Sequence, residues 1–184
     1  FENYLETINR QIKDIEKLVN EFSNFARMPR PIFKKINLYK IITRSVDLLK
    51  MSSKNEINFK TKHKDLEING DEEQLNRVFI NLIKNSEEAF MELSKKTPSF
   101  KGKIDIAIES NNDYIVVIIT DNGTGITDTK KVMTPYYTTK IKGTGLGLPI
   151  VNKIINEHSG DFSIQNKKDG NGVNIEISFP KLNA

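Results

Sequence analysis

The sequence predicts an α/β protein, a two-layer sandwich in which helices cover a mixed sheet, preceded by one long helix. Two observations support this class. Helix patterns and short apolar strand patterns follow one another in the order helix, short strands, helix, two strands, loop, helix, two strands. The later strands come in adjacent pairs joined by short turns, which favours a mixed sheet over a doubly wound parallel one.

The composition is typical of a soluble globular protein with one ordinary domain and an appendage. The chain has 184 residues, 37% of them hydrophobic and 28% charged. It has no apolar run near the roughly 18 residues of a membrane span, and no signal-peptide pattern. The absence of cysteine excludes disulfides and thiolate metal sites. The net charge is +4, but the lysines alternate with acidic residues, so we expect this fragment to contact neither nucleic acid nor membrane.

The first 27 residues predict a helix with an unbroken heptad seam, because its apolar residues are alternately three and four positions apart. A 3.5-residue period favours a partner helix, and the alternative is an amphipathic helix that packs on its own domain. Pro29 and Pro31 end the helix and place a domain boundary between residues 1–30 and 31–184. The seam consists of Leu5, Ile8, Ile12, Ile15, Val19, Phe22 and Ala26.

Two further helices are predicted before the middle of the chain. Asn37 can cap a helix over residues 38–51, and strand-like pieces follow at 57–60 and 66–68. Asp71 is the expected N-cap of a helix over 71–93, with Gln74 completing a capping box. The expected inward side chains are Leu38, Ile41, Ile42, Val46, Leu48 and Leu49 in the first helix, and Leu75, Val78, Phe79, Leu82, Ala89, Phe90 and Leu93 in the second.

The second half of the chain predicts four strands, a lid and a helix. Apolar runs over 103–109 and 114–120 indicate a pair of strands joined by a turn at 111–113. Residues 121–144 are polar, glycine-bearing and without periodicity, which is typical of a loop or lid. A helix over about 146–157 and a last pair of strands near 161–166 and 173–179 complete the predicted order.

A carboxylate followed by two closely spaced glycines stands at the end of the 114–120 strand. The stretch is Asp121-Asn122-Gly123-Thr124-Gly125. Glycine lacks a Cβ, so it permits both a positive φ and the close approach of a ligand to the backbone. The same residues also form good turns. By itself the stretch therefore leaves both a ligand site and a plain turn open.

Two further patterns carry possible chemistry. Asn81 and Asn85 are four residues apart on the predicted 71–93 helix, so both amides point the same way. They are either polar flank residues or hard oxygen ligands for Mg²⁺. The segment 142–149, Lys-Gly-Thr-Gly-Leu-Gly-Leu-Pro, directly precedes a helix, where exposed N–H groups and the helix dipole favour phosphate. It is neither a Walker motif nor a dinucleotide fingerprint.

Together these patterns resemble the N, G1, F and G2 boxes of the catalytic, ATP-binding domain of sensor histidine kinases. The four stretches occur in the family's order and cover about residues 35–180. The end of the first helix resembles the second dimerisation-domain helix of NtrY-like nitrogen-regulation kinases. The implied fold is the Bergerat-type ATP-binding fold. The matching stretches are Asn81 to Asn85, Asp121 to Gly125, the Pro-Tyr-Tyr-Thr-Thr-Lys segment 135–140, and Gly143 to Leu148.

The resemblance implies a role for each matching residue. Asp121 would accept a hydrogen bond from the adenine amino group and disfavour guanine, which has an acceptor oxygen there. Asn85 would bind Mg²⁺, with Asn81 on the phosphate side, and Lys140 would reach the γ-phosphate. The implied catalytic residues are Asn81, Asn85 and Lys140. The implied ATP-binding residues are Asn81, Asn85, Asp121, Gly123, Gly125, Ile126, Thr139, Lys140, Gly143, Thr144, Gly145, Leu146, Gly147 and Leu148.

The resemblance also implies the activity and the partners. This domain would transfer the γ-phosphoryl group of ATP to a histidine of the dimerisation domain, for passage to a response regulator. The full-length protein would be a homodimer anchored in the bacterial inner membrane, with this part in the cytoplasm. The sequence departs from the family in two ways: Met133 and Thr134 precede Pro135 where phenylalanine is frequent, and the acceptor histidine is missing. His63 and His158 match no acceptor motif, so we expect both to be structural or surface residues.

Two alternatives remain at this point. ATPases of the Hsp90, gyrase and MutL type resemble this fold but carry a glutamate four residues before the metal-binding asparagine. Asn81 occupies that position here, and a neutral amide cannot act as a general base, which disfavours hydrolysis. The second alternative is a module that binds ATP or a partner without chemistry.

Overall fold

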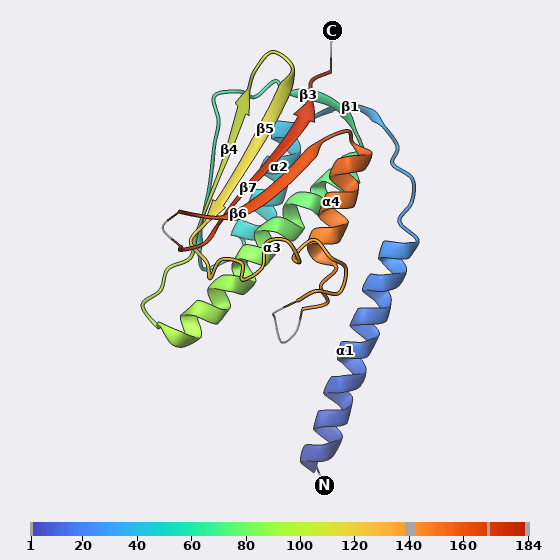
Figure 1. The fold of residues 1–184 in the computed structure, drawn as a ribbon, viewed down its shortest axis with the longest axis vertical. Helices are drawn as coiled ribbons and strands as arrows, with labels where there is room; N and C mark the ends of the chain where they lie inside the picture. Colours follow the sequence, from blue (N-terminus) through green and yellow to red (C-terminus); the bar gives the residue numbers. More distant parts are fainter. Residues whose placement is uncertain (1, 139–142, 169, 183–184) are drawn as a thin grey trace.

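A computed structural model describes residues 2–138, 143–168 and 170–182, and it contains the predicted mixed sheet (Figure 1). The strand order of this five-stranded sheet is β2-β4-β5-β7-β6. β2 and β4 are parallel and the other neighbours are antiparallel. The strands are β2 (Glu56–Lys60), β4 (Lys103–Ser110), β5 (Tyr114–Asp121), β6 (Asp161–Asn166) and β7 (Val173–Pro180). The predicted α/β class is therefore confirmed.

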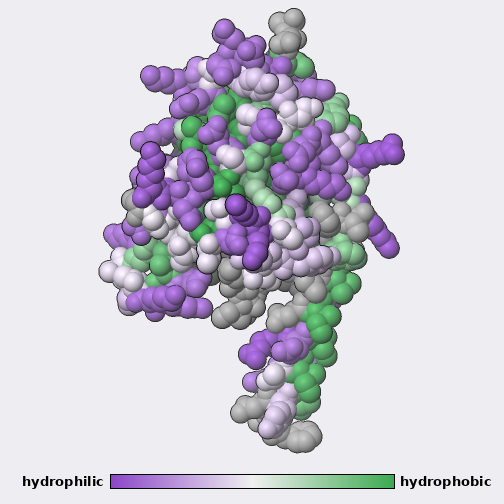
Figure 2. Space-filling view, viewed as in Figure 1, coloured by the Kyte–Doolittle hydropathy of each residue, from purple (hydrophilic) through white to green (hydrophobic). Residues whose placement is uncertain are grey.

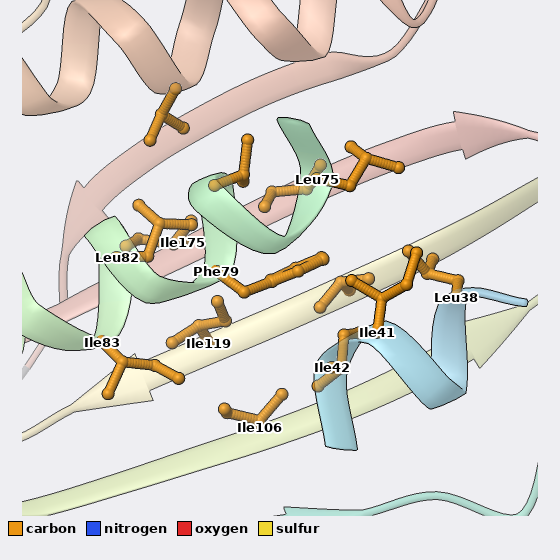
Figure 3. Close-up of a cluster of buried hydrophobic side chains, with 14 of the residues drawn as sticks. Leu38, Ile41, Ile42, Leu75, Phe79, Leu82, Ile83, Ile106, Ile119 and Ile175 are labelled. Carbon is orange, nitrogen blue, oxygen red and sulfur yellow. The ribbon is translucent and has the colours of Figure 1, made fainter. Parts of the chain in front are cut away.

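Three helices, α2 (Leu38–Lys50), α3 (Glu72–Lys96) and α4 (Gly147–Glu157), lie behind the sheet in the view of Figure 1. Their apolar stripes and the facing sheet residues form one core, in which Phe79 is fully buried. Figure 3 shows Phe79 reaching from α3 toward the sheet and α2. Among the expected inward residues, Leu48 is exposed, because it lies on the opposite side of α2 from the buried Val46. Ala89 and Leu93 are half-buried.

The structure contains a second, smaller sheet, of which the sequence predicted only the strand near residues 66–68. β1 (Lys34–Asn37) pairs antiparallel with β3 (Glu67–Gly70), and Ile36 lies opposite Ile68. β1 is only four residues long and follows a proline-rich stretch, so its pattern is too short to predict a strand. This sheet leads directly into α2, whose predicted cap is confirmed because the Asn37 side chain accepts a hydrogen bond from the Lys40 N–H.

The helix α1 (Glu2–Ala26) extends away from the domain, as Figures 1 and 2 show. Figure 2 shows a hydrophobic stripe along one side of this helix. The described members of the seam, Leu5 to Phe22, are between 48% and 59% exposed. No described helix is both long and apolar enough to cross a membrane. The boundary between residues 1–30 and 31–184 remains a prediction.

The start of α3 holds the segment that connects α1 to the domain. The Asp71 carboxylate caps α3 by accepting from the N–H groups of Glu73 and Gln74, and it also accepts from the Ile32 N–H at 2.7 Å. The expected capping box is not formed. Gln74 donates to the Pro29 carbonyl instead, and the Asp71 N–H donates to Nε2 of His158 at 2.9 Å.

Candidate functional site

Asp121 stands at the end of β5 as a buried carboxylate with three protein donors. It is 5% exposed. Its Oδ1 accepts from the N–H groups of Gly123 at 2.9 Å and Val173 at 3.2 Å. Its Oδ2 accepts from the Ser86 hydroxyl at 2.6 Å. Because a buried charge must be hydrogen-bonded, these donors from three separate segments fix the carboxylate in one orientation.

The residues after Asp121 form a wall with no room for side chains at the glycines. A Cβ on Gly123 would lie 2.9 Å from the Ala89 Cβ on α3. Gly125 has a φ of 74°, a conformation that other residues adopt only with strain. The next residue, Ile126, is held by Asn166 at the end of β6: its N–H donates to Oδ1 at 2.7 Å, and its carbonyl accepts from Nδ2 at 2.8 Å.

Asn85 and the glycine loop meet although they are far apart in sequence. α3 and α4 lie side by side (Figure 1). A Cβ on Gly147 would lie 3.8 Å from both Oδ1 and Nδ2 of Asn85. Asn81 lies one turn earlier on α3, and both asparagines are partly exposed. The predicted N-box amide is thus adjacent to the predicted G2 loop.

The N-terminus of α4 has the features of an anion site. Its N-cap position is occupied by the buried Leu146, whose apolar side chain makes no capping hydrogen bond. The first N–H groups of a helix have no partner within it and carry partial positive charge. Gly145 has a φ of 68°, and its carbonyl accepts from the Tyr136 N–H, which joins the loop to the lid. Gly143 and Thr144 precede it, and Leu148 lies in the first turn of α4.

The lid is described only in part. Thr139, Lys140 and Lys142 lie outside the described residues, so the implied roles of Thr139 and Lys140 remain predictions. Tyr136 lies near α1, since its ring centroid is 6.4 Å from that of Phe22. The described residues contain no group of three or more His, Cys, Asp or Glu side chains that could hold a metal. The donors that remain suitable for Mg²⁺ are amide oxygens such as that of Asn85, assisted by phosphate and water.

The structure adds two residues that the motifs did not identify, Ser86 and Asn166. Ser86 had a signal, because it fills the gap between Leu82 and Ala89 in the predicted apolar stripe of α3. A hydroxyl at a core position needs a partner. Asn166 ends a strand and has no such pattern around it. The two histidines fit the structural or surface expectation, because His158 is buried and His63 is exposed.

Comparisons with known proteins agree with this geometry. The family of histidine kinase-, DNA gyrase B- and HSP90-like ATPases matches residues 70–183. The NtrY-like sensor histidine kinase of Rickettsia conorii is 37% identical over 182 residues, which cover 97% of this chain and 29% of the relative. The nitrogen regulation protein NtrY of Azorhizobium caulinodans is 32% identical over 183 residues, 97% of this chain and 23% of the relative. The chain thus spans less than a third of these relatives.

Solved structures give the same result. The catalytic domain of histidine kinase ThkA is 31% identical, with a TM-score of 0.70 over 82% of this chain and 96% of that chain. A structure of ThkA in complex with the response regulator protein TrrA is 27% identical, with a TM-score of 0.75 over 97% of this chain and 51% of that chain.

The chain therefore belongs to the histidine kinase-, DNA gyrase B- and HSP90-like ATPase family. Within this family its relatives are sensor histidine kinases, and the resemblance to NtrY-like kinases is confirmed. The domain is an ATP-binding catalytic domain of that kind.

Proposed function

We propose that this chain positions Mg²⁺–ATP and transfers the γ-phosphoryl group to a histidine of a dimerisation domain. The observation that supports the proposal most strongly is that two adjacent residues of α3 contact the two halves of the predicted site. Ser86 touches the buried Asp121 carboxylate, while the neighbouring Asn85 lies close to Gly147 at the start of α4. A base bound at Asp121 and phosphates bound at the start of α4 would therefore both lie next to the turn of α3 that carries Asn85 and Ser86.

In this proposal each group has a separate task. Asp121 receives the adenine amino group, and Gly123 to Ile126 form the wall beside the base. The N–H groups at the start of α4 and the glycines before it bind the phosphates. Asn85 binds Mg²⁺, which supplies positive charge to the phosphate oxygens, and Asn81 lies on the same face of α3. Thr139 and Lys140 contribute from the lid, with Lys140 near the γ-phosphate.

The proposed task of the domain is to align Mg²⁺–ATP for phosphoryl transfer, and it does not include the activation of water. Asn81 is a neutral amide in the position where the ATPases resembling this fold carry a glutamate, so it cannot act as a general base. Phosphoryl transfer needs alignment and charge stabilisation more than a covalent enzyme group. The acceptor histidine would come from the first dimerisation helix of the longer protein, with a response regulator aspartate as the next acceptor.

The half-exposed seam of α1 supports the remaining proposals. Its heptad period and its exposure fit the second helix of a dimerisation domain that pairs within a homodimer. The relatives are sensor kinases of greater length. We therefore place this part in the cytoplasm of a bacterium, attached to a sensor that is anchored in the inner membrane.

The decisive test is phosphate labelling with purified components. ATP labelled at the γ-phosphate should leave no acid-labile phosphate on the chain alone. It should label an added dimerisation domain that carries the acceptor histidine. Rapid phosphate release without any labelled histidine would support a hydrolase, and binding without either product would support a non-catalytic module.

The metal site has its own test. Titration calorimetry of Asn85→Ala should lose the Mg²⁺-dependent part of the ATP affinity, whereas binding in EDTA should change little. Asn76→Ala is a suitable control on the same helix, because Asn76 lies near the N-terminal end of α3, where its side chain accepts a hydrogen bond from Ser45. An unchanged Mg²⁺ dependence in Asn85→Ala would remove Asn85 from the metal site.

A further inference from the structure

Ser86 makes a contact that its position in a helix does not require. Its hydroxyl is 3.5 Å from the Leu82 carbonyl, one turn earlier, and 2.6 Å from Oδ2 of Asp121. Ser94 on the same helix shows the ordinary arrangement, because its hydroxyl donates to the Phe90 carbonyl at 2.8 Å. The single hydroxyl hydrogen of Ser86 therefore goes to the carboxylate, where the bond is short and charge-assisted.

The hydrogen bonds of Asp121 leave one acceptor direction open. A carboxylate offers about four lone-pair directions, two on each oxygen. On Oδ1 both are used by the N–H groups of Gly123 and Val173. On Oδ2 the Ser86 hydroxyl uses one. The remaining direction is on the same oxygen that Ser86 binds, so the serine is adjacent to any ligand group that Asp121 receives.

We propose that Ser86 is a specificity-determining residue that sets Asp121 to receive an exocyclic amino group and reject a carbonyl oxygen. Its hydroxyl holds Oδ2 in place. Because its hydrogen is committed to Asp121, Ser86 presents only oxygen lone pairs to the ligand. Both groups at this point are then acceptors, which suits the adenine amino group and repels the carbonyl oxygen of guanine. This inference rests on the proposed function, since it concerns the same nucleotide site.

Removal of the hydroxyl has a defined consequence for each nucleotide. In Ser86→Ala the Oδ2 atom loses the one donor that the described residues give it, so this oxygen can bind water instead. ATP then loses a preset acceptor for its amino group. Purine riboside triphosphate lacks the amino group and makes no hydrogen bond to this acceptor, so its affinity should change little. The difference between the two nucleotides separates specificity from a general structural effect.

The experiment is titration calorimetry of the 184-residue chain with ATP, GTP and purine riboside triphosphate. We expect Ser86→Ala to weaken ATP about tenfold, the cost of one buried hydrogen bond to a charged group, and to change purine riboside triphosphate less than about twofold. GTP should change little, so the preference for ATP over GTP should narrow. Ser94→Ala removes a hydroxyl from the same helix without touching Asp121, and it should leave all three affinities unchanged.

Each other outcome has a definite meaning. If Ser86→Ala loses equal affinity for ATP and purine riboside triphosphate, or loses none for either, the proposed role of Ser86 is wrong. The proposed function would still stand in that case, provided that the parent chain binds ATP. Failure of the parent chain to bind ATP would overturn the proposed function itself. Ser86→Cys provides a second variant of nearly the same size with a weaker donor. If Ser86→Ala does not fold, Ser86→Cys must show the same selective loss of ATP affinity.

Discussion

The helices α1 and α3 are both 25 residues long and both amphipathic, but they are stabilised in different ways. The stripe of α3 includes Leu75, Phe79 and Leu82, all fully buried under the sheet and its neighbouring helices. The described stripe of α1 is about half-exposed. An apolar stripe therefore shows which face of a helix packs against another element. The spacing of its apolar residues indicates whether that element is a partner helix or the rest of the domain. The 3.5-residue seam of α1 favours a partner helix, and the stripe of α3 is covered within the domain.

The largest expected effect is in the core under α3. Phe79→Ala should lower the free energy of unfolding by about 3–5 kcal/mol, because it leaves a cavity between the helix and the sheet. Phe22→Ala in α1 removes the same side chain from a half-exposed position, so its loss should be far smaller. Urea unfolding followed by circular dichroism measures both variants. Similar losses in the two would contradict the contrast between the helices.

The junction between α1 and the domain should give the next largest effect. Asp71→Ala removes the cap of α3 and should cost about 1–2 kcal/mol. It also removes the acceptor of the Ile32 N–H, so hydrogen exchange at Ile32 should become faster. Asn37→Ala is the matched control, because it removes the cap of α2 without touching the connecting segment. If Asn37→Ala accelerates exchange at Ile32 equally, Asp71 does not hold this segment.

Asp71 also gives this junction a dependence on acid. Burial acts to raise the pKa of its carboxyl, but hydrogen bonds from the N–H groups of Ile32, Gln74 and Glu73 outweigh it and hold the pKa below 3.8. The stability from these bonds is therefore present above pH 3.8 and lost as the pH falls through the lowered pKa. Asp71→Asn should remove this part of the acid dependence of unfolding.

His158 should give a smaller effect near neutral pH. Burial lowers the pKa of its imidazole, against the opposing effects of the Ile154 carbonyl and the Asp71 and Glu157 carboxylates. Nδ1 contacts the Ile154 carbonyl, and Nε2 accepts from the Asp71 N–H, so the neutral ring is the form that fits. A lowered folded-state pKa means that stability is full above pH 6.5 and falls below it, by at most about 1.4 kcal/mol per pH unit.

Urea unfolding at pH 7.5 and 5.5 tests this dependence. His158→Gln should lose it, since it removes the titrating ring. His63→Gln should keep it, because His63 is the other histidine of the chain and is exposed. Equal pH dependence in the parent and in His158→Gln would show that another group is responsible.

The contrast between α1 and α3 also explains what could be predicted from the sequence. The elements and the Asp121 motif were predictable because periodicity and turn residues are local signals. The partners of Asp121 were not, since Ser86 and Val173 come from distant segments. Gln74 was predicted to complete a capping box, but His158 takes the Asp71 N–H and Gln74 binds Pro29. Such choices depend on tertiary contacts that compete with the local motif.

The smallest expected effect is on the α1 seam itself. Ile12 is 56% exposed, so Ile12→Ala should change the free energy of unfolding of the domain by less than about 0.5 kcal/mol. Ile42→Ala is the matched control, because Ile42 is fully buried in α2 and its loss should cost about 2–5 kcal/mol. Thermal or urea unfolding of the two variants compares the same deletion in the two settings. If Ile12→Ala costs as much as Ile42→Ala, α1 is covered by this domain and not by a partner helix, and the assignment of its seam to dimerisation fails.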